Sequence, residues 1–238
     1  GVYGLLQPLV RAGVPVSACV MERCADTAYL SRFRVIVLSY EAWKPADAGA
    51  GTALARWVRE GGSLIVLGAA AELDGAPFWW RKLGHASPLQ HLLAEVGTVD
   101  LEDGERPVGK GWVIRRAASP RRFADPAAAR GEYLPLVDLA LRKTGDARGL
   151  SMPGSFCLRR GPFIVAHAAS SPLAVPGKLV DVLDPELPML DGARLELGSS
   201  GLYRDASRDA SWDSGGPGGA GRRPRVLHAT HRLVDSQY

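Results

Sequence analysis

The 238-residue sequence is poor in the features that would identify a membrane protein or a disulfide-bonded protein. It contains no apolar stretch of about 18 residues or more, which excludes a transmembrane helix. It has only three cysteines, without a CxxC pair or the ligand spacing of a metal site: Cys19, Cys24 and Cys157. Such a small, odd number argues against a disulfide framework and fits a reducing compartment. We therefore expect a cytoplasmic protein with no metal and no cofactor.

Lysine is also scarce, because arginine supplies 24 of the 29 basic side chains behind a net charge of +4. A nucleic-acid-binding face needs clustered basic residues interleaved with aromatic ones. Here the arginine pairs are scattered and aromatics make up 7% of the chain, which argues against a nucleic-acid partner. The sequence starts with Gly1 rather than methionine. We therefore expect an interior piece of a longer polypeptide, in which an upstream targeting signal would not be visible.

A strand–helix–strand pattern spans residues 34–75 and organises the N-terminal half. Residues 34–39 (RVIVLS) and 63–67 (SLIVL) are short apolar runs rich in β-branched residues, as in strands buried on both faces. Between them, an amphipathic helix over 52–60 ends at Gly61-Gly62, where a helix terminus favours glycine. A helix joining two such strands predicts a parallel sheet, and ligands bind such sheets at the carboxyl ends of the strands.

The flanking segments extend this pattern into one α/β domain over residues 1–148. We expect further strands over 14–21 and 111–115, and helices over 2–12, 125–143 and 88–96, the last with Ser87 as its N-cap. This order of elements favours a flavodoxin-like parallel sheet with helices on both faces.

The C-terminal part predicts a small all-β sandwich over residues 149–238. A stretch rich in glycine and proline at 145–154 marks the boundary. After it, short strand-like runs alternate with Gly/Pro turns, and no helical period appears. The last of these runs, 225–229, follows a segment at 204–223 in which Arg-Asp-Ala-Ser occurs twice before glycine dominates. Such a composition predicts a disordered surface loop.

The loops after the two central strands lack a nucleophilic cysteine: they read Ser39-Tyr40 and Gly68-Ala69-Ala70-Ala71. In its strand order the domain resembles a class I glutamine-amidotransferase-like domain. In that family these loops carry a Gly-Gly oxyanion hole and a Gly-x-Cys-x-Gly elbow, and a His-x-Glu motif lies downstream. No His-x-Glu occurs in this chain. Because a thiolate mechanism needs a sulfur at the elbow, we expect no amidotransferase activity.

A domain of this kind followed by a β module resembles the non-catalytic middle and C-terminal domains of family 42 β-galactosidases and related glycoside hydrolases. The resemblance rests on residues 38–45, on 57–63 (WVREGGS), and on the runs 159–163 and 180–185. It implies a trimerisation-type domain and assembly into homo-oligomers such as trimers. It also implies an upstream (β/α)₈ barrel that holds the catalytic glutamates, so this chain itself contributes no catalytic residue.

Carboxylates and tryptophans gather in the loops after the central strands and form a candidate carbohydrate site. Exposed tryptophan rings beside carboxylates bind sugars by stacking and hydrogen bonding, although the same side chains also serve in cores and interfaces. The candidate substrate-binding residues are Tyr40, Glu41, Trp43, Glu72, Asp74, Trp79 and Trp80.

Three functions are compatible with these features. The first is a non-catalytic C-terminal region of a glycoside hydrolase that serves oligomer assembly and shapes the carbohydrate site. The second is a stand-alone carbohydrate-binding or scaffold protein with the tryptophan loops as its contact surface. The third is a small hydrolase that uses Glu41, Glu72 or Asp74, which requires a pocket that joins at least two of these carboxylates.

Overall fold

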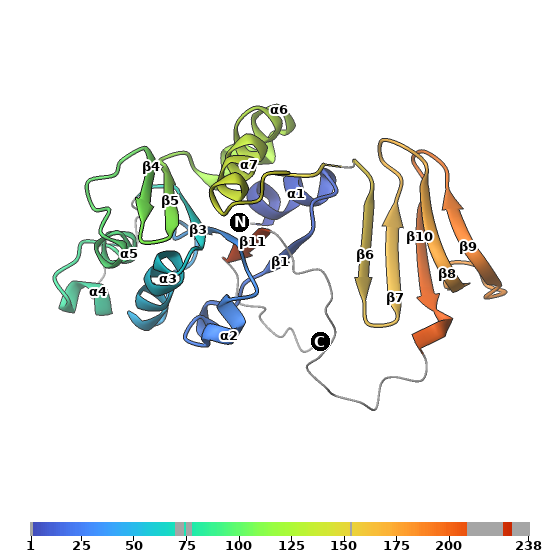
Figure 1. Cartoon of the computed structure of the whole chain (residues 1–238), viewed down its shortest axis with the longest axis horizontal. Coiled ribbons are helices and arrows are strands. Elements are labelled where there is room, and N and C mark those ends of the chain that lie inside the picture. Colours follow the sequence, from blue (N-terminus) through green and yellow to red (C-terminus); the bar gives the residue numbers. More distant parts are fainter. Residues whose placement is uncertain (1, 70–73, 75–77, 153, 209–225, 230–238) are drawn as a thin grey trace. The chain divides into compact units, whose positions relative to one another are not determined.

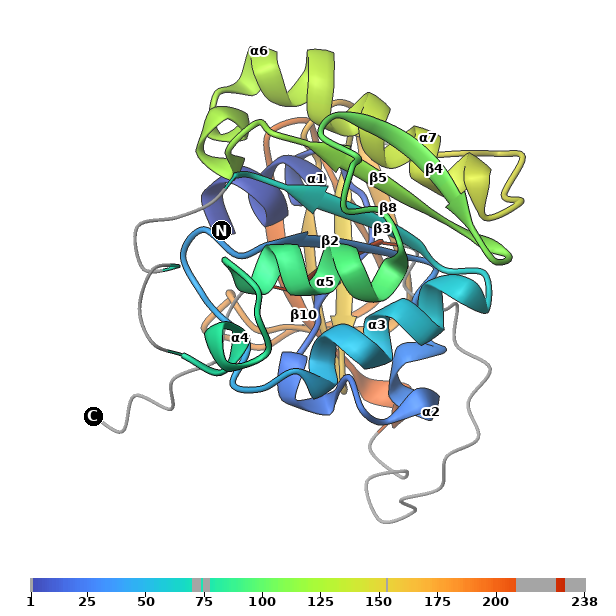
Figure 2. The same ribbon diagram turned by 90° about the vertical axis from the view of Figure 1, so that its left-hand side faces the viewer.

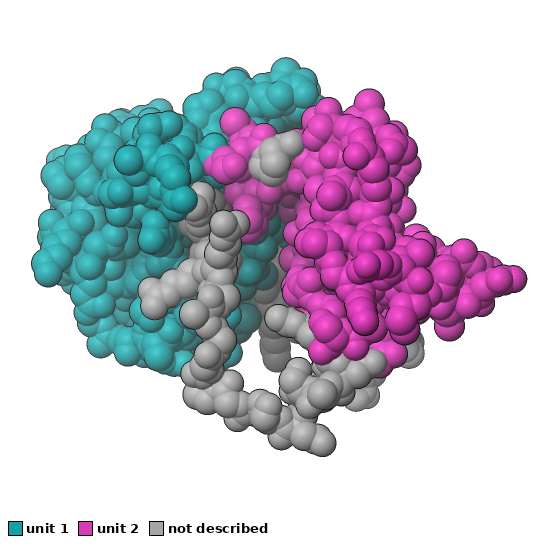
Figure 3. All heavy atoms as spheres, turned by 45° about the vertical axis from the view of Figure 1, so that its right-hand side comes forward, with its two compact units in different colours: residues 1–8, 16–150, 223–238 teal, residues 9–15, 151–222 magenta. Residues whose placement is uncertain are grey.

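Two compact units make up the computed structural model of this chain (Figures 1 and 3). The structure describes residues 2–69, 74, 78–152, 154–208 and 226–229. The first unit comprises Gly1–Pro8, Val16–Leu150 and Arg223–Tyr238, and the second comprises Leu9–Pro15 and Ser151–Arg222. No helix in the described ranges is long and apolar enough to cross a membrane.

A six-stranded mixed sheet forms the centre of the first unit (Figures 1 and 2). Its order is β1-β11-β2-β3-β5-β4, and all neighbours are parallel except the antiparallel pair β4 and β5. The predicted α/β class is therefore confirmed, whereas the flavodoxin-like order remains a prediction. The strands are β1 (Val16–Ala18), β2 (Val35–Ser39), β3 (Ser63–Leu67), β4 (Gly104–Val108), β5 (Gly111–Arg116) and β11 (Val226–Ala229).

Helices cover both faces of this sheet. In Figure 2, α3 (Gly49–Arg59) and α5 (Pro88–Val96) lie on one face, and α7 (Leu134–Lys143) lies on the other. Ile36 of β2 packs in the same core as α3 and α5, and the strand alternation turns its neighbour Val37 to the opposite face, where it is also buried. This burial on two faces explains why the central strands are uninterrupted apolar runs.

Shorter helical elements complete the first unit and begin the second. The α-helices are α1 (Gln7–Arg11), α2 (Thr27–Leu30), α4 (Trp79–Lys82) and α6 (Pro126–Ala128). Single helical turns of other types occupy Val2–Leu6, Met21–Arg23, Pro120–Ala124, Ala129–Tyr133 and Ala206–Arg208.

Two predicted helix termini are confirmed in detail. After α3 the chain turns at Gly62, where a Cβ would lie 2.3 Å from the Trp57 ring, so only glycine fits without a rearrangement. The Trp57 indole Nε1 donates a hydrogen bond to the Phe33 carbonyl at 3.3 Å, which fixes the ring in this place. At the start of α5, the Ser87 hydroxyl accepts a hydrogen bond from the Gln90 backbone N–H at 3.0 Å, the contact of an N-cap.

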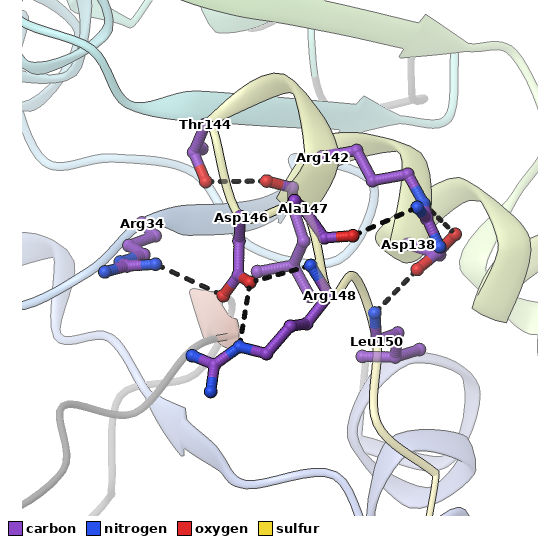
Figure 4. Close-up of polar contacts among 9 residues, drawn as sticks. Arg34, Asp138, Arg142, Thr144, Asp146, Ala147, Arg148 and Leu150 are labelled. Atoms are coloured by element: carbon purple, nitrogen blue, oxygen red, sulfur yellow. Dashed lines mark hydrogen bonds and ion pairs between the residues drawn. The ribbon is translucent and has the colours of Figure 1, made fainter.

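The segment after α7 is tied to the first unit by two carboxylates (Figure 4). Asp146 is buried and accepts hydrogen bonds from Arg34 Nη1 and from the Arg148 backbone N–H, both at 3.2 Å. Asp138 accepts from the Leu150 backbone N–H at 2.6 Å. These contacts explain why the first unit extends to Leu150, although the linker-like composition starts earlier.

The second unit contains an antiparallel sheet of five strands in the order β6-β7-β10-β8-β9. Ile164, Leu179 and Tyr203 belong to its core. The predicted all-β character is confirmed, and the described residues show this one sheet; a sandwich of two sheets remains a prediction. The strands are β6 (Phe156–Arg160), β7 (Phe163–His167), β8 (Leu173–Asp181), β9 (Met189–Leu195) and β10 (Ser200–Asp205).

The assignment of residues 149–238 to one β domain needs a correction at its end. Strand β11 pairs with β1 and β2 in the parallel sheet of the first unit, not with the antiparallel sheet. An apolar run shows that a strand forms but not which distant strand it pairs with, so the sequence pattern could not place it. Of the loop predicted over 204–223, residues 204–208 complete β10 and a helical turn, and 209–223 lie outside the described residues.

Acid is expected to destabilise the second unit through Asp205 at the end of β10. Hydrogen bonds from Ser207 and then Arg159 lower the pKa of this carboxyl from 3.8 to about 2. Because the folded-state pKa is depressed, the stabilisation is complete above about pH 4 and is lost as the pH falls towards 2. Acid titration followed by circular dichroism should show a less acid-sensitive Asp205→Asn variant; identical titration curves would contradict this assignment.

Candidate functional site

The candidate site residues surround the carboxyl ends of β2, β3 and β5, the edge at which parallel sheets bind ligands. The loop after β2 carries Tyr40, Glu41, Trp43 and Lys44, and the loop after β5 carries Ser119. The sheet thus brings together groups that lie nearly 80 positions apart. Glu72, which the sequence placed in the same site, lies outside the described residues.

Glu41 covers the end of β3. Gly68, with φ of +90°, leaves room for its carboxylate, and a Cβ at this position would lie 2.5 Å from Glu41 Oε1. The Ser119 hydroxyl donates a hydrogen bond to Glu41 Oε2 at 2.6 Å, and Arg115 Nη1 donates to the Gly68 carbonyl at 3.3 Å. The Glu41 carboxylate, from the loop after β2, therefore lies against Gly68 at the end of β3 and is held by Ser119 in the loop after β5.

Lys44 makes a second cross-link at this edge. Its ammonium group contacts Asp74 Oδ1 and donates a hydrogen bond to the Tyr40 carbonyl at 2.6 Å. The side chains of Lys44 and Asp74 are only 14% and 8% exposed. Tyr40 is buried as well, and burial raises the pKa of its hydroxyl. These residues hold the loops in place and present little surface to a ligand.

Two of the three candidate tryptophans belong to an aromatic cluster. Trp80 is 1% exposed, and its indole Nε1 donates to the Asp74 carbonyl at 2.9 Å. The Trp79 ring is half-buried; its Nε1 donates to the Pro45 carbonyl at 2.9 Å, and its centroid lies 4.9 Å from that of His91 in an edge-to-face arrangement. Burial lowers the pKa of His91. Both rings therefore pack against other groups of the protein.

Trp43 differs from the other two because it lines a surface hollow of about 160 Å³. Two acidic residues, Glu22 and Asp47, line the same hollow. Met21, Pro45 and Ala50 are among its apolar lining residues. An aromatic face beside acceptor oxygens is the combination that suits a polyhydroxylated ligand. Sequence reasoning missed Glu22 and Asp47, although Glu22 lies in the helical turn that follows β1 and Asp47 in the loop that follows β2, at the same edge of the sheet.

A larger hollow of about 400 Å³ adjoins the loop after β5, but its charges are already paired. Phe123 and Leu136 are among the apolar groups that line it. Arg116 at its wall forms an ion pair with Asp103 at 3.3 Å, and Glu132 accepts a hydrogen bond from Arg122 Nε at 2.8 Å. Within the described part of the chain, no group of three His, Cys, Asp or Glu side chains could hold a metal ion.

Comparisons with known proteins add little to this description. No protein-family model matches the chain, and no curated protein matches its sequence. Among solved structures, a rhamnosidase from Novosphingobium sp. PP1Y is similar with a TM-score of 0.28 and 16% sequence identity. The match covers 74% of this chain and 16% of the rhamnosidase. A likeness at this TM-score carries no argument about fold or function.

Proposed function

We propose that this chain is a non-catalytic region of a glycoside hydrolase, in which the amidotransferase-like α/β unit and the β unit serve oligomer assembly and shape the carbohydrate site. The observation that carries the proposal is the blocked end of β3, where Glu41 lies against Gly68 and is held by Ser119. An acyl-transfer enzyme of this architecture needs an open nucleophile at that turn. The chain offers Gly68-Ala69-Ala70-Ala71 instead.

The hydrolase alternative is less well supported by the described carboxylates. A glycosidase needs one carboxyl group that gives a proton to the substrate and a second that faces it. Asp74 contacts Lys44 and Glu41 accepts from Ser119, so both carboxylates face groups of the protein. In the proposed assembly the partners are further copies of the chain, as a trimer or other homo-oligomer, and an upstream catalytic barrel.

Carbohydrate contact is the second part of the proposal, and the hollow beside Trp43 favours it. Its volume of about 160 Å³ suits a single sugar ring, which could stack on the indole while Glu22 and Asp47 accept hydrogen bonds from its hydroxyl groups. Of the candidate tryptophans, Trp43 is thus the one placed to meet a ligand. Trp79 and Trp80 act indirectly, because they donate hydrogen bonds to Pro45 in the loop after β2 and to Asp74 in the loop after β3.

Two measurements on the purified chain test this function. We expect no turnover of nitrophenyl β-galactoside or β-glucoside, because the candidate acids Glu41 and Asp74 are engaged with Ser119 and Lys44. Calorimetric titration with simple galactosides and glucosides should detect weak binding that Trp43→Ala reduces by about tenfold or more. Trp112→Ala is the matched control, since Trp112 lies on β5 and contacts Lys143 instead of the hollow.

Each outcome addresses a different part of the proposal. Turnover by the wild-type chain that survives removal of contaminating enzymes would contradict the non-catalytic role. Binding that is equal in wild type and Trp43→Ala would exclude the hollow as the carbohydrate contact. Equal losses in the Trp43 and Trp112 variants would indicate a general effect on folding.

A further inference from the structure

Sulfur-containing side chains are unusually concentrated in one loop of the first unit. The chain has three cysteines and three methionines in all, and half of these six lie within positions 19–24: Cys19, Met21 and Cys24. The loop follows β1, so it emerges at the same edge of the sheet as the candidate carbohydrate site. All three side chains are buried, and neither cysteine forms a disulfide.

Cys24 neighbours both of the other sulfur-containing side chains. Its Sγ lies 4.0 Å from Met21 Sδ, and its thiol interacts with the Cys19 thiol. Tyr29 borders the cluster: it contacts Cys19, and its hydroxyl accepts a hydrogen bond from the Val20 backbone N–H at 2.8 Å. This last bond fixes the backbone between the two cysteines, so the sulfur atoms are held by a short, internally bonded loop.

From this geometry we propose that Cys19, Met21 and Cys24 form a binding site for one soft monovalent metal ion, Cu(I). In a trigonal site, each of three sulfur atoms lies about 2.3 Å from the metal ion. The sulfur atoms are then about 4.0 Å from one another. The Cys24–Met21 separation of 4.0 Å already has this value. Thiolate and thioether donors select Cu(I), whereas Zn²⁺ takes four ligands in structural sites.

Charge and access both agree with an ion of this kind. Binding is an exchange without redox change, in which two metal–thiolate bonds form and two thiol protons pass to solvent. The site then holds two thiolates and one positive ion. Arg23 lies nearby, with its guanidinium 4.4 Å from the Tyr29 ring centroid. Its sequence neighbour Glu22, which lines the hollow, adds a negative charge. Met21 lines the 160 Å³ hollow, so the cluster borders a space that opens to solvent.

The site can be tested by anaerobic titration of the reduced full-length chain with Cu(I) held by the chromogenic chelator bicinchoninate. We expect one Cu(I) per chain. Affinity should fall about 100-fold in Cys19→Ser and Cys24→Ser and about tenfold in Met21→Leu, since a charged thiolate binds the ion more strongly than a neutral thioether. Matched controls are Cys157→Ser and Met189→Leu, whose native side chains are exposed in the second unit. Both should bind as wild type does.

If a variant at one of these buried positions fails to fold, X-ray absorption of the wild-type copper complex tests the proposal without it. Sulfur neighbours at about 2.3 Å are expected, with no nitrogen or oxygen in the first shell. A shell of nitrogen and oxygen, failure of the wild type to compete with the chelator, or loss of the ion in Cys157→Ser would each overturn the assignment.

Discussion

Trp80→Ala is expected to lower the free energy of unfolding of the first unit by about 3–5 kcal/mol, the usual cost of truncating a buried tryptophan. The indole is 1% exposed and is among the largest fully buried side chains. Its removal leaves a cavity between the Phe78 and Trp79 rings, whose centroids lie 4.8 and 5.5 Å from the Trp80 ring. It also leaves the Asp74 carbonyl without the indole N–H that it accepts from.

Urea unfolding followed by circular dichroism measures this effect, and Phe78→Ala is the matched control. Phe78 belongs to the same aromatic cluster but is 47% exposed, so its truncation should cost about 1 kcal/mol or less. A Trp80→Ala variant as stable as wild type would show that the ring does not support the core. If that variant also lost sugar binding, Trp80 would have to be assigned to the ligand contact that the sequence first gave it.

The contrast between Trp43 and Trp80 shows what the sequence could and could not predict about the site. Local patterns determined that both would lie in loops after buried strands, at the edge where parallel sheets bind ligands. Whether a ring in such a loop is covered depends on its neighbours in space. The turn of helix over Trp79–Lys82 carries Trp80 inward, whereas Trp43 lines a hollow. The hydrophobic pattern of the sequence does not distinguish the buried tryptophan from the one at the hollow.

The same distinction applies to the fold. The pattern over 34–67 predicted β2, α3 and β3 within a few residues, because strand burial on two faces and a helix ending at glycine are local signals. Strand β11 was assigned to the wrong sheet, because it pairs with β2 and β1, which lie about 190 and 210 positions earlier in the chain. Ser119 was missed for a similar reason: its role arises only when β5 lies beside β3 and brings it to Glu41.

Lys44→Met is expected to cost about 3–5 kcal/mol, because it removes the cation from a buried ion pair. Lys44 contacts Asp74 and the Tyr40 carbonyl, and the two charged side chains are 14% and 8% exposed. Asp74→Asn should also destabilise the first unit. The double variant should lose less than the sum of the two single variants, with a coupling of about 1–3 kcal/mol, since each single change disrupts the same contact.

An exposed ion pair in the same unit provides the control for this cycle. Arg23 and Asp26 are 58% and 48% exposed and 3.5 Å apart, so Arg23→Met should cost about 1 kcal/mol or less. Additive losses at Lys44 and Asp74 in urea unfolding would contradict the structural role of the pair. If Asp74→Asn were neutral for stability, the carboxylate would be available for chemistry, and the hydrolase hypothesis would regain one of its two required acids. A coupled loss instead assigns Lys44 and Asp74 to the framework that holds the Trp80 loop against the end of the sheet.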